Sequence, residues 1–291
     1  MVAFDIVLSG VILGGTYALI ALGLTLQYGV ARIMNLAYGE LLIAAAFGAY
    51  WLFVAKAVSP LAGLIVVIPV AFALNWLIYR FLLTPLVRRA KSRDALEADS
   101  ILATFGMLFI VQGGLLVAFG GQYYSDRFLQ SAVIILGDTV EANKLVTAAF
   151  AIVASLGLYL ALTHTRAGTA IRAVAVAPGS ARLVGIDVER LSAFAFALGG
   201  ALSAAGGVLV SMSLLFSATS GVLFTMKALI IVIMGGAGNL LGSLVAGLIL
   251  GIAEIAVARL IDPGLTIAIN FVLFLAVLLI RPAGLFGRAA A

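Results

Sequence analysis

The chain has 291 residues, of which 64% are hydrophobic and only 10% are charged, whereas a soluble domain carries roughly 25% charged and 45–50% apolar residues. Its 17 basic and 12 acidic side chains are too few to cover the exterior of a soluble fold of this length. These numbers exclude a water-soluble enzyme. The absence of cysteine excludes a thiol nucleophile and a cysteine-ligated zinc site, and a single histidine leaves no His-rich metal site.

Long apolar segments dominate the chain. A helix needs about 20 mostly apolar residues to cross the hydrocarbon core of a bilayer. The segment Val222–Leu260 is too long for one span, and the glycine-rich turn 235–239 interrupts it, so it predicts a short span or re-entrant helix followed by a full span. We expect an all-α polytopic membrane bundle of eight or nine transmembrane helices, forming one domain over residues 1–291. The other predicted spans are Ile6–Val30, Leu36–Ala55, Leu61–Leu83, Ile101–Gly120, Leu145–Thr163, Leu191–Phe216 and Leu265–Ile280.

The basic residues predict how this bundle is oriented, because loops rich in lysine and arginine stay on the cytoplasmic side. With the N-terminus outside, the cytoplasmic segments hold Arg32, Arg80, Arg88, Arg89, Lys91, Arg93, Arg166, Arg172, Arg182, Arg190, Arg281 and Arg288. The external segments then hold Lys56, Arg127, Lys144, Lys227 and Arg259. This bias predicts an external N-terminus and a cytoplasmic C-terminus.

Two internal loops differ in character. The segment Thr84–Ser100 is a basic connector, whereas His164–Arg190 alternates arginines with apolar residues and is broken by Pro178 and Gly179. This pattern predicts a short helix, a turn and a second short helix beside the membrane. Two interpretations remain open: a membrane-surface helix anchored by its arginines, or a docking surface for a cytoplasmic partner.

Ionisable groups inside spans are costly and indicate function by default. Glu40, Lys227 and Glu254 are the three that qualify. Asn35 is a candidate cap for the second span, which places Glu40 about 7 Å along its axis, near the membrane interface. Glu254 either lines a pathway or pairs with Arg259, and Lys227 is expected to snorkel outward. The candidate pathway or helix-cap residues are Asn35, Tyr38, Glu40, Gln112 and Glu254.

Small residues recur at every fourth position in two later spans. Such ladders let helix backbones approach closely, either within one chain or against a second subunit. The sequence shows no clear internal repeat, although an inverted one is compatible with it. The ladder residues are Gly199, Ser203, Gly207 and Ser211 in one span, and Asn239, Ser243, Gly247 and Gly251 in the other, with Gly10 and Gly14 repeating the spacing.

Several catalytic motifs are absent from the sequence. It contains no G-x-x-x-x-G-K-[ST] phosphate-binding loop and no H-E-x-x-H metal motif. The chain therefore provides a pathway without an ATP-binding site, and we expect no catalytic residue, cofactor or metal on it.

Two stretches of the sequence resemble a known family. The stretch 28–41, which reads YGVARIMNLAYGEL, and the stretch 168–186, which begins GTAIRAVA, are similar to segments of LivH-type permease subunits of branched-chain amino acid ABC importers. The glycine-rich turn 235–239 and the ending RPAGLFG at 281–287 match in style. The family usually has histidine where Tyr38 stands and an acidic residue after Pro178, so this chain departs from it at both places.

The resemblance implies a transport function and a set of partners. The chain would form the translocation path with a homologous second permease (LivM-like), in a bacterial inner membrane and in contact with its lipid, for leucine, isoleucine and valine. Two ATPase subunits (LivG/LivF-like) would carry ATP-Mg, and a periplasmic or extracellular binding protein would deliver substrate; no nucleic acid is involved. The ATPases would dock on the coupling loop 164–190, at Arg172, Ala173, Ala177, Pro178, Arg182 and Gly185.

Three other functions remain as alternatives. Related permeases serve urea, short amides or other amino acids. An ATPase-independent secondary transporter or channel would need coupling charges at the bilayer midplane, which are scarce here. A polytopic membrane enzyme would need a catalytic constellation, which the sequence lacks.

Overall fold

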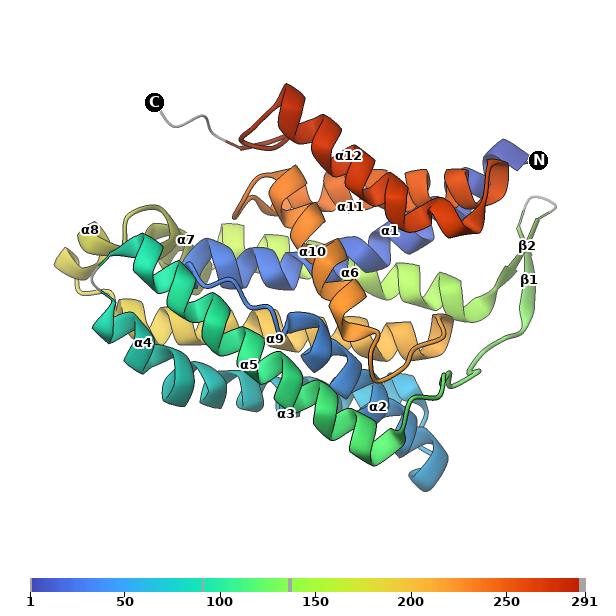
Figure 1. Ribbon diagram of the computed structural model, residues 1–291, viewed down its shortest axis with the longest axis horizontal. Coiled ribbons are helices and arrows are strands. Elements are labelled where there is room, and N and C mark those ends of the chain that lie inside the picture. Colours follow the sequence, from blue (N-terminus) through green and yellow to red (C-terminus); the bar gives the residue numbers. More distant parts are fainter. Residues whose placement is uncertain (1, 91, 136–137, 288–291) are drawn as a thin grey trace.

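The structure is a computed structural model that describes residues 2–90, 92–135 and 138–287, and it is an elongated bundle of helices (Figure 1). Its elements in chain order are α1 (Val2–Leu26), the π-helix η1 (Gln27–Ala31), α2 (Tyr38–Lys56), α3 (Pro60–Ile78), the π-helix η2 (Tyr79–Leu83), α4 (Thr84–Arg89), α5 (Arg93–Phe119), β1 (Ala132–Ile135), β2 (Asp138–Glu141), α6 (Ala142–His164), α7 (Arg166–Val176), α8 (Pro178–Leu183), α9 (Val188–Ser213), α10 (Gly221–Gly235), α11 (Leu240–Leu260), the 3-10 helix η3 (Pro263–Leu265) and α12 (Thr266–Ile280).

The predicted spans correspond to these helices. Among the described residues, eight helical segments are long and apolar enough to cross a membrane, and α10 is a shorter apolar helix of 15 residues. The segment Val222–Leu260 divides into α10 and α11 at the glycine-rich turn, as the sequence predicts. The chain is therefore a multi-pass helical membrane protein.

Polar side chains mark where several helices begin. Ser59, Ser92, Thr165, Asp187 and Asn239 each stand at the N-cap of a helix and accept a hydrogen bond from a backbone N–H three residues ahead. These bonds satisfy N–H groups that the first turn of a helix otherwise leaves without a partner. The caps place the helix starts locally, before any packing between helices.

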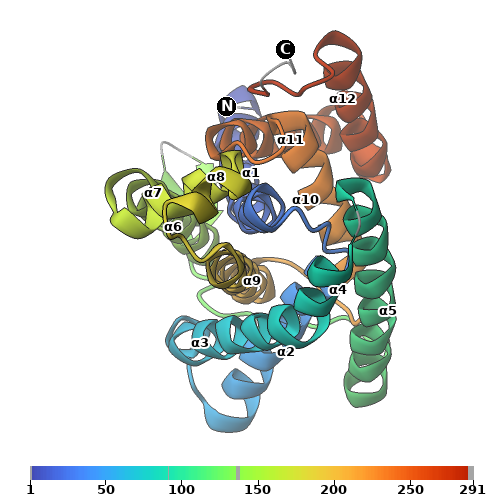
Figure 2. The same ribbon diagram turned by 90° about the vertical axis from the view of Figure 1, so that its left-hand side faces the viewer.

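The helices form two sets of four that pack in the same way, and corresponding helices of the two sets run in opposite directions. One set is α1, α10, α11 and α12, and the other is α9, α2, α3 and α5. α11 and α10 pack on α1 as α3 and α2 pack on α9, while α12 contacts α10 as α5 contacts α2. α1 and α9 lie side by side at the centre (Figure 2), and Figure 1 shows them running in opposite directions along the bundle. The bundle thus contains the inverted repeat with which the sequence is compatible. In the chain, α6 to α8 lie between α5 and α9.

The two ends of the bundle carry different elements. α7, α8 and α4 gather at one end, whereas the β1–β2 hairpin and the start of α1 lie at the other (Figure 1). The predicted cytoplasmic arginines of α4, α7 and α8 therefore share one end, although which side of the membrane it faces stays a prediction. Lys91 and Arg288, which the prediction counts as cytoplasmic, lie outside the described residues.

Candidate functional site

The segment α7–α8 forms a bent helical pair at one end of the bundle. Ala177, whose backbone is not helical (φ −143°, ψ 79°), separates the two helices, and Pro178 opens α8. The buried side of the pair includes Ile171, Val174 and Ala181, which belong to one hydrophobic cluster with residues of α1, α6 and α9. The helix–turn–helix predicted from the amphipathic pattern is confirmed.

The opposite side of this pair carries apolar groups that nothing in the described chain covers. Val176, Leu183 and Val184 are 75%, 88% and 75% exposed. Large apolar side chains that cluster at an exposed surface indicate an interaction site. Arg172 and Arg182 are exposed beside them.

Arg32 connects the α7–α8 pair to the end of α1. Its guanidinium donates a hydrogen bond of 3.1 Å to the carbonyl of Ala175, and its backbone adopts the left-handed region at φ 56°, which is uncommon for a residue other than glycine. Arg32 therefore links α7 to the segment that joins α1 to α2, and α7–α8 itself connects α6 to α9.

The segment 32–37 returns from the end of α1 into the bundle, so that α2 begins near the middle of its length (Figure 1). Asn35 fixes this segment: its Oδ1 accepts a hydrogen bond of 3.1 Å from the backbone N–H of Ala37, and its Nδ2 donates to Gln27 at 3.2 Å. The N-cap of α2 is Ala37, without a side-chain hydrogen bond. The prediction that Asn35 caps α2 is wrong, because the side-chain amide of Asn35 forms its hydrogen bonds with Ala37 and Gln27 rather than with the first turn of the helix.

The N-terminal turns of α2 and α10 meet at this point. The hydroxyl of Thr225 on α10 accepts a hydrogen bond of 2.8 Å from the backbone N–H of Gly39 and donates one of 3.3 Å to the carbonyl of Leu36. The sequence analysis missed Thr225, whose signal is its place one turn into a helix too short to span a membrane. Tyr38 is fully buried and donates to the carbonyl of Ile20 on α1 at 2.5 Å.

Glu40 lies in this junction with no exposed surface. A Cβ on Gly221 would overlap its carboxyl group, so the carboxyl lies against the first residue of α10. Neither carboxyl oxygen has a hydrogen-bond partner among the described residues. The return of segment 32–37 places Glu40 farther into the bundle than a count along α2 from Asn35 predicts. Its carboxyl group lies at the N-terminal turns of two helices, where their dipoles are positive.

A second polar cluster connects α1, α10, α11 and α12. Lys227 contacts both carboxyl oxygens of Glu254, at 2.8 and 3.0 Å, and the hydroxyl of Tyr17 at 2.5 Å. Asn270 donates to the same carboxyl group at 3.4 Å. The prediction that Lys227 snorkels outward is wrong, because a buried carboxylate lies within reach. Glu254 does not pair with Arg259, which forms its ion pair with Asp5 in the first turn of α1.

The small-residue ladders pack within the chain. A Cβ on Gly251 would overlap the backbone of Gly14 on α1, and one on Gly247 would lie 2.8 Å from Ala18. Ser243 shares a hydrogen bond of 2.7 Å with Thr25, also on α1. Of the two interpretations of this ladder, packing against the chain itself is confirmed.

The ladder on α9 contacts α1 and α2. Gly199 approaches the carbonyl of Gly23, and Gly207 approaches the carbonyl of Leu42, so that neither position has room for a side chain. Ser203 donates to the carbonyl of Tyr38 at 3.3 Å. Gln112 stands apart from this packing: it is half-buried on α5, which lies at the outside of the bundle (Figure 2).

Comparison with known proteins assigns the family. A family model described as "Branched-chain amino acid transport system / permease component" matches residues 6–280. The chain is 30% identical to the high-affinity branched-chain amino acid transport system permease protein LivH of Escherichia coli K12, with 96% of this chain and 94% of that protein aligned. It is 28% identical to the permease protein BraD of Pseudomonas aeruginosa, with the same two shares. It is 32% identical to a probable LivH of Methanocaldococcus jannaschii, over 95% of this chain and 90% of that protein.

No solved structure matches the chain. The family model nevertheless covers all eight of the long spans, and the relatives align over nearly their full length. The chain therefore belongs to the family of permease components of branched-chain amino acid transport systems, and it is a transport subunit rather than an enzyme.

Proposed function

We propose that this chain is one of two permease subunits of an ABC importer for leucine, isoleucine and valine, located in a bacterial inner membrane as one transmembrane domain. The names of its relatives support the substrate class. The α7–α8 end faces the cytoplasm in this proposal, which agrees with the gathering of arginines there.

The observation that carries the proposal is the exposed apolar surface of Val176, Leu183 and Val184 on a bent helical pair that is otherwise packed into the bundle. Two ATPase subunits (LivG/LivF-like), which hold ATP-Mg, dock on this surface. The contact residues include Arg172, Ala173, Ala177, Pro178, Arg182 and Gly185. A substrate-binding protein delivers the amino acid at the opposite end of the bundle.

Closure of the ATPases on ATP moves α7–α8. The movement reaches α6 and α9 through the chain and the start of α2 through Arg32. The ATPases drive the switch because they bind the outward-open and inward-open states with different affinities. The bond from Arg32 links the coupling element to the start of α2, where the candidate residues Asn35, Tyr38 and Glu40 lie buried.

The path itself forms between this chain and a second permease (LivM-like). Gln112 on the outer helix α5 is the candidate path residue best placed to face that subunit. Glu254 is a poorer candidate, because Lys227 already pairs with its carboxylate.

The docking surface is tested with Leu183→Asp in the co-expressed complex. The variant places a charge at an 88% exposed apolar position, and we expect it to lose the ATPase subunits on purification and to lose ATP-driven leucine uptake in proteoliposomes. Ile134→Asp is the matched control: Ile134 is 74% exposed on the hairpin at the other end, so the ATPases should be retained. Gly185 is less suitable, because its φ of 81° makes any side chain there strained.

Three results would contradict the proposal. Normal ATPase retention and uptake in Leu183→Asp would remove the docking surface. Uptake by vesicles that contain this chain without any ATPase would favour a secondary transporter or channel. ATP-driven uptake of urea or a short amide in place of leucine would keep the ABC mechanism and replace the substrate.

A further inference from the structure

A cavity of about 650 Å³ opens at the α4 end of the bundle, between the α3–η2–α4 segment and the start of α9. Its lining holds four arginines, Arg80, Arg88, Arg89 and Arg190, and two acidic residues, Asp187 and Glu189. The cavity therefore carries a net positive charge.

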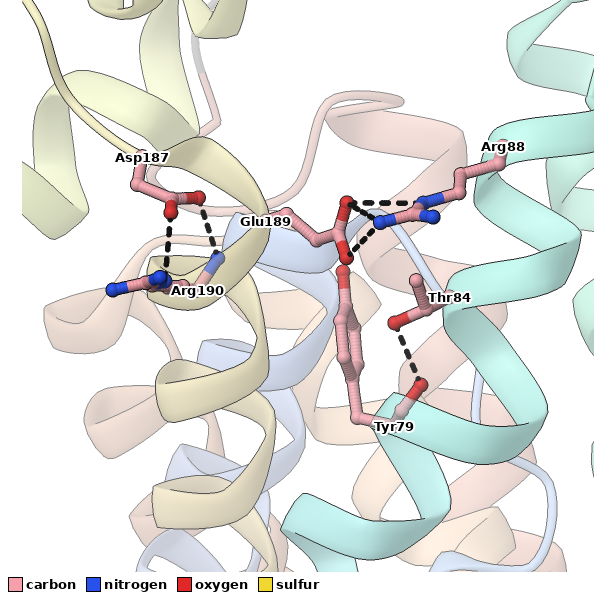
Figure 3. Close-up of polar contacts among 6 residues, drawn as sticks. All are labelled: Tyr79, Thr84, Arg88, Asp187, Glu189 and Arg190. Carbon is pink, nitrogen blue, oxygen red and sulfur yellow. Dashed lines mark hydrogen bonds and ion pairs between the residues drawn. The ribbon is translucent and has the colours of Figure 1, made fainter.

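The two acidic residues are already paired (Figure 3). Arg88 contacts both carboxyl oxygens of Glu189, at 2.9 and 3.1 Å, and Arg190 lies 2.9 Å from Asp187. Within the described chain Arg80 and Arg89 form no ion pair. The excess charge of the cavity thus resides on these two exposed guanidinium groups.

The wall of the cavity is a wide turn that interrupts the α3–α4 helix. The hydroxyl of Thr84 donates a hydrogen bond of 3.0 Å to the carbonyl of Tyr79, five residues earlier (Figure 3). This is the spacing of the π-helix η2, and such turns inside helices are frequent at functional sites. The neighbouring Phe81 is 72% exposed on the same turn.

An aromatic strip continues from the cavity along α3 and α9. Trp76, which lines the cavity, stacks on Phe72, and Phe72 meets Phe194 of α9 edge to face at 5.6 Å between centroids. Phe194 is partly exposed. Tryptophan is enriched at the level of the lipid headgroups, and a partly exposed aromatic strip that continues from Trp76 into the bundle fits an acyl chain.

We propose that this cavity binds the headgroup of an anionic phospholipid, with Arg80 and Arg89 on the phosphate and an acyl chain along Phe72 and Phe194. Guanidinium groups bind phosphate oxygens with paired, charge-assisted hydrogen bonds, and basic pockets between membrane helices bind anionic headgroups. The strip favours a lipid over a free phosphate or an acidic side chain of an ATPase. The assignment of the site to the cytoplasmic leaflet rests on the proposed function, whereas the site itself does not.

The test uses the purified full-length chain, both alone and in its complex, after delipidation in detergent. Dioleoylphosphatidylglycerol and dioleoylphosphatidylcholine are titrated separately, and bound lipid is counted by native mass spectrometry. The ratio of phosphatidylglycerol affinity to phosphatidylcholine affinity should fall by about fivefold in Arg80→Gln and by about fivefold in Arg89→Gln. In the double variant we expect the two decreases to multiply. Arg172→Gln with Arg182→Gln is the matched control for lipid binding by the chain alone, because it removes two exposed charges at the same end outside the cavity. It is not used in the complex, where these two residues belong to the proposed ATPase contact.

Several outcomes would overturn the proposal. Equal binding of the two lipids by the wild-type chain would do so, as would an equal loss in the control pair, which would indicate general surface attraction. If inorganic phosphate bound to the chain as tightly as phosphatidylglycerol, the cavity would be assigned to a free anion. Loss of ATPases from the Arg80→Gln/Arg89→Gln complex with the lipid preference retained would assign it to a protein contact. If the double variant does not fold, each single variant gives the same test, and ATPase loss in Leu183→Asp is read independently of lipid binding.

Discussion

The ion pair between Lys227 and Glu254 should stabilise the bundle only while both partners are present. Their side chains are 18% and 12% exposed, and removal of one member of a buried pair costs about 3–5 kcal/mol because the other charge is left uncompensated. We expect about 3 kcal/mol for Lys227→Met, which strands the carboxylate with the weaker donors Tyr17 and Asn270. Glu254→Gln keeps an acceptor for these donors and should cost about 2 kcal/mol.

The double variant separates the pair from its surroundings. If the two losses were independent they would add to about 5 kcal/mol, but the double variant leaves no buried charge, and we expect about 2–3 kcal/mol. At about 2 °C per kcal/mol for a chain of this size, Lys227→Met lowers the Tm by about 6 °C, Glu254→Gln by about 4 °C, and the double variant by about 5 °C.

The assay is thermal unfolding of the purified chain in detergent, followed by tryptophan fluorescence at a fixed protein and detergent concentration. Lys144→Met with Glu141→Gln is the matched control, because these residues form an exposed pair at 3.3 Å and such pairs contribute less than about 1 kcal/mol. A decrease of about 10 °C in the Lys227→Met/Glu254→Gln variant would show that the two residues act separately, and would refute the reasoning.

Three further predictions concern packing, the helix junction and Asp126, an acidic residue between α5 and β1. Gly251→Ala should lower the free energy of unfolding by about 1–3 kcal/mol, because the new Cβ overlaps α1. Gly157→Ala is the control: its Cβ meets no atom within 4 Å, so it should stabilise the helix by about 0.5–1 kcal/mol. Similar Tm changes in the two variants would argue against close packing of the α11 ladder on α1. Thr225→Val leaves the buried N–H of Gly39 without its acceptor and should cost about 1–3 kcal/mol, against little change for the exposed Thr169→Val. Burial raises the pKa of the Asp126 carboxyl group, so the folded state holds its proton more tightly than the unfolded state. The stability of the fold therefore falls as the pH rises from the carboxyl pKa of the unfolded state through the higher pKa of the folded state. Asp126→Asn should raise the Tm at pH 8, and this advantage over the wild type should shrink toward pH 4.

The number and order of the spans could be predicted because they depend on local properties of the sequence, whereas some ends could not: α5 begins at Arg93 rather than Ile101, and the predicted connector Thr84–Ser100 contains α4. A run of apolar residues, a capping side chain or a glycine-rich turn acts within a few positions of itself, and Ser59, Asp187 and Asn239 mark helix starts for that reason. The break at Pro178 is of the same kind.

The partners of the buried polar groups could not be predicted, because they come from distant parts of the chain. Lys227 finds its acceptor 27 residues away and on another helix, and nothing in the sequence distinguishes this arrangement from snorkelling. The depth of Glu40 in the bundle does not follow from its distance along the chain from Asn35, because segment 32–37 turns back into the bundle before α2 begins. The glycine ladder at Gly247 and Gly251 indicated close packing but not that α1 is the neighbour.

The shortness of α10 has a consequence for how the protein is inserted. Its 15 residues extend about 22 Å, less than the roughly 30 Å of hydrocarbon, so the helix is too short to cross the core by itself. Non-helical backbone is tolerated at membrane depth only when protein surrounds it, and residues 214–220, which precede α10, are not helical. Because α10 packs on α1 and α2, we expect it to settle only after those two helices are in place, which makes the last third of the chain dependent for its insertion on the first.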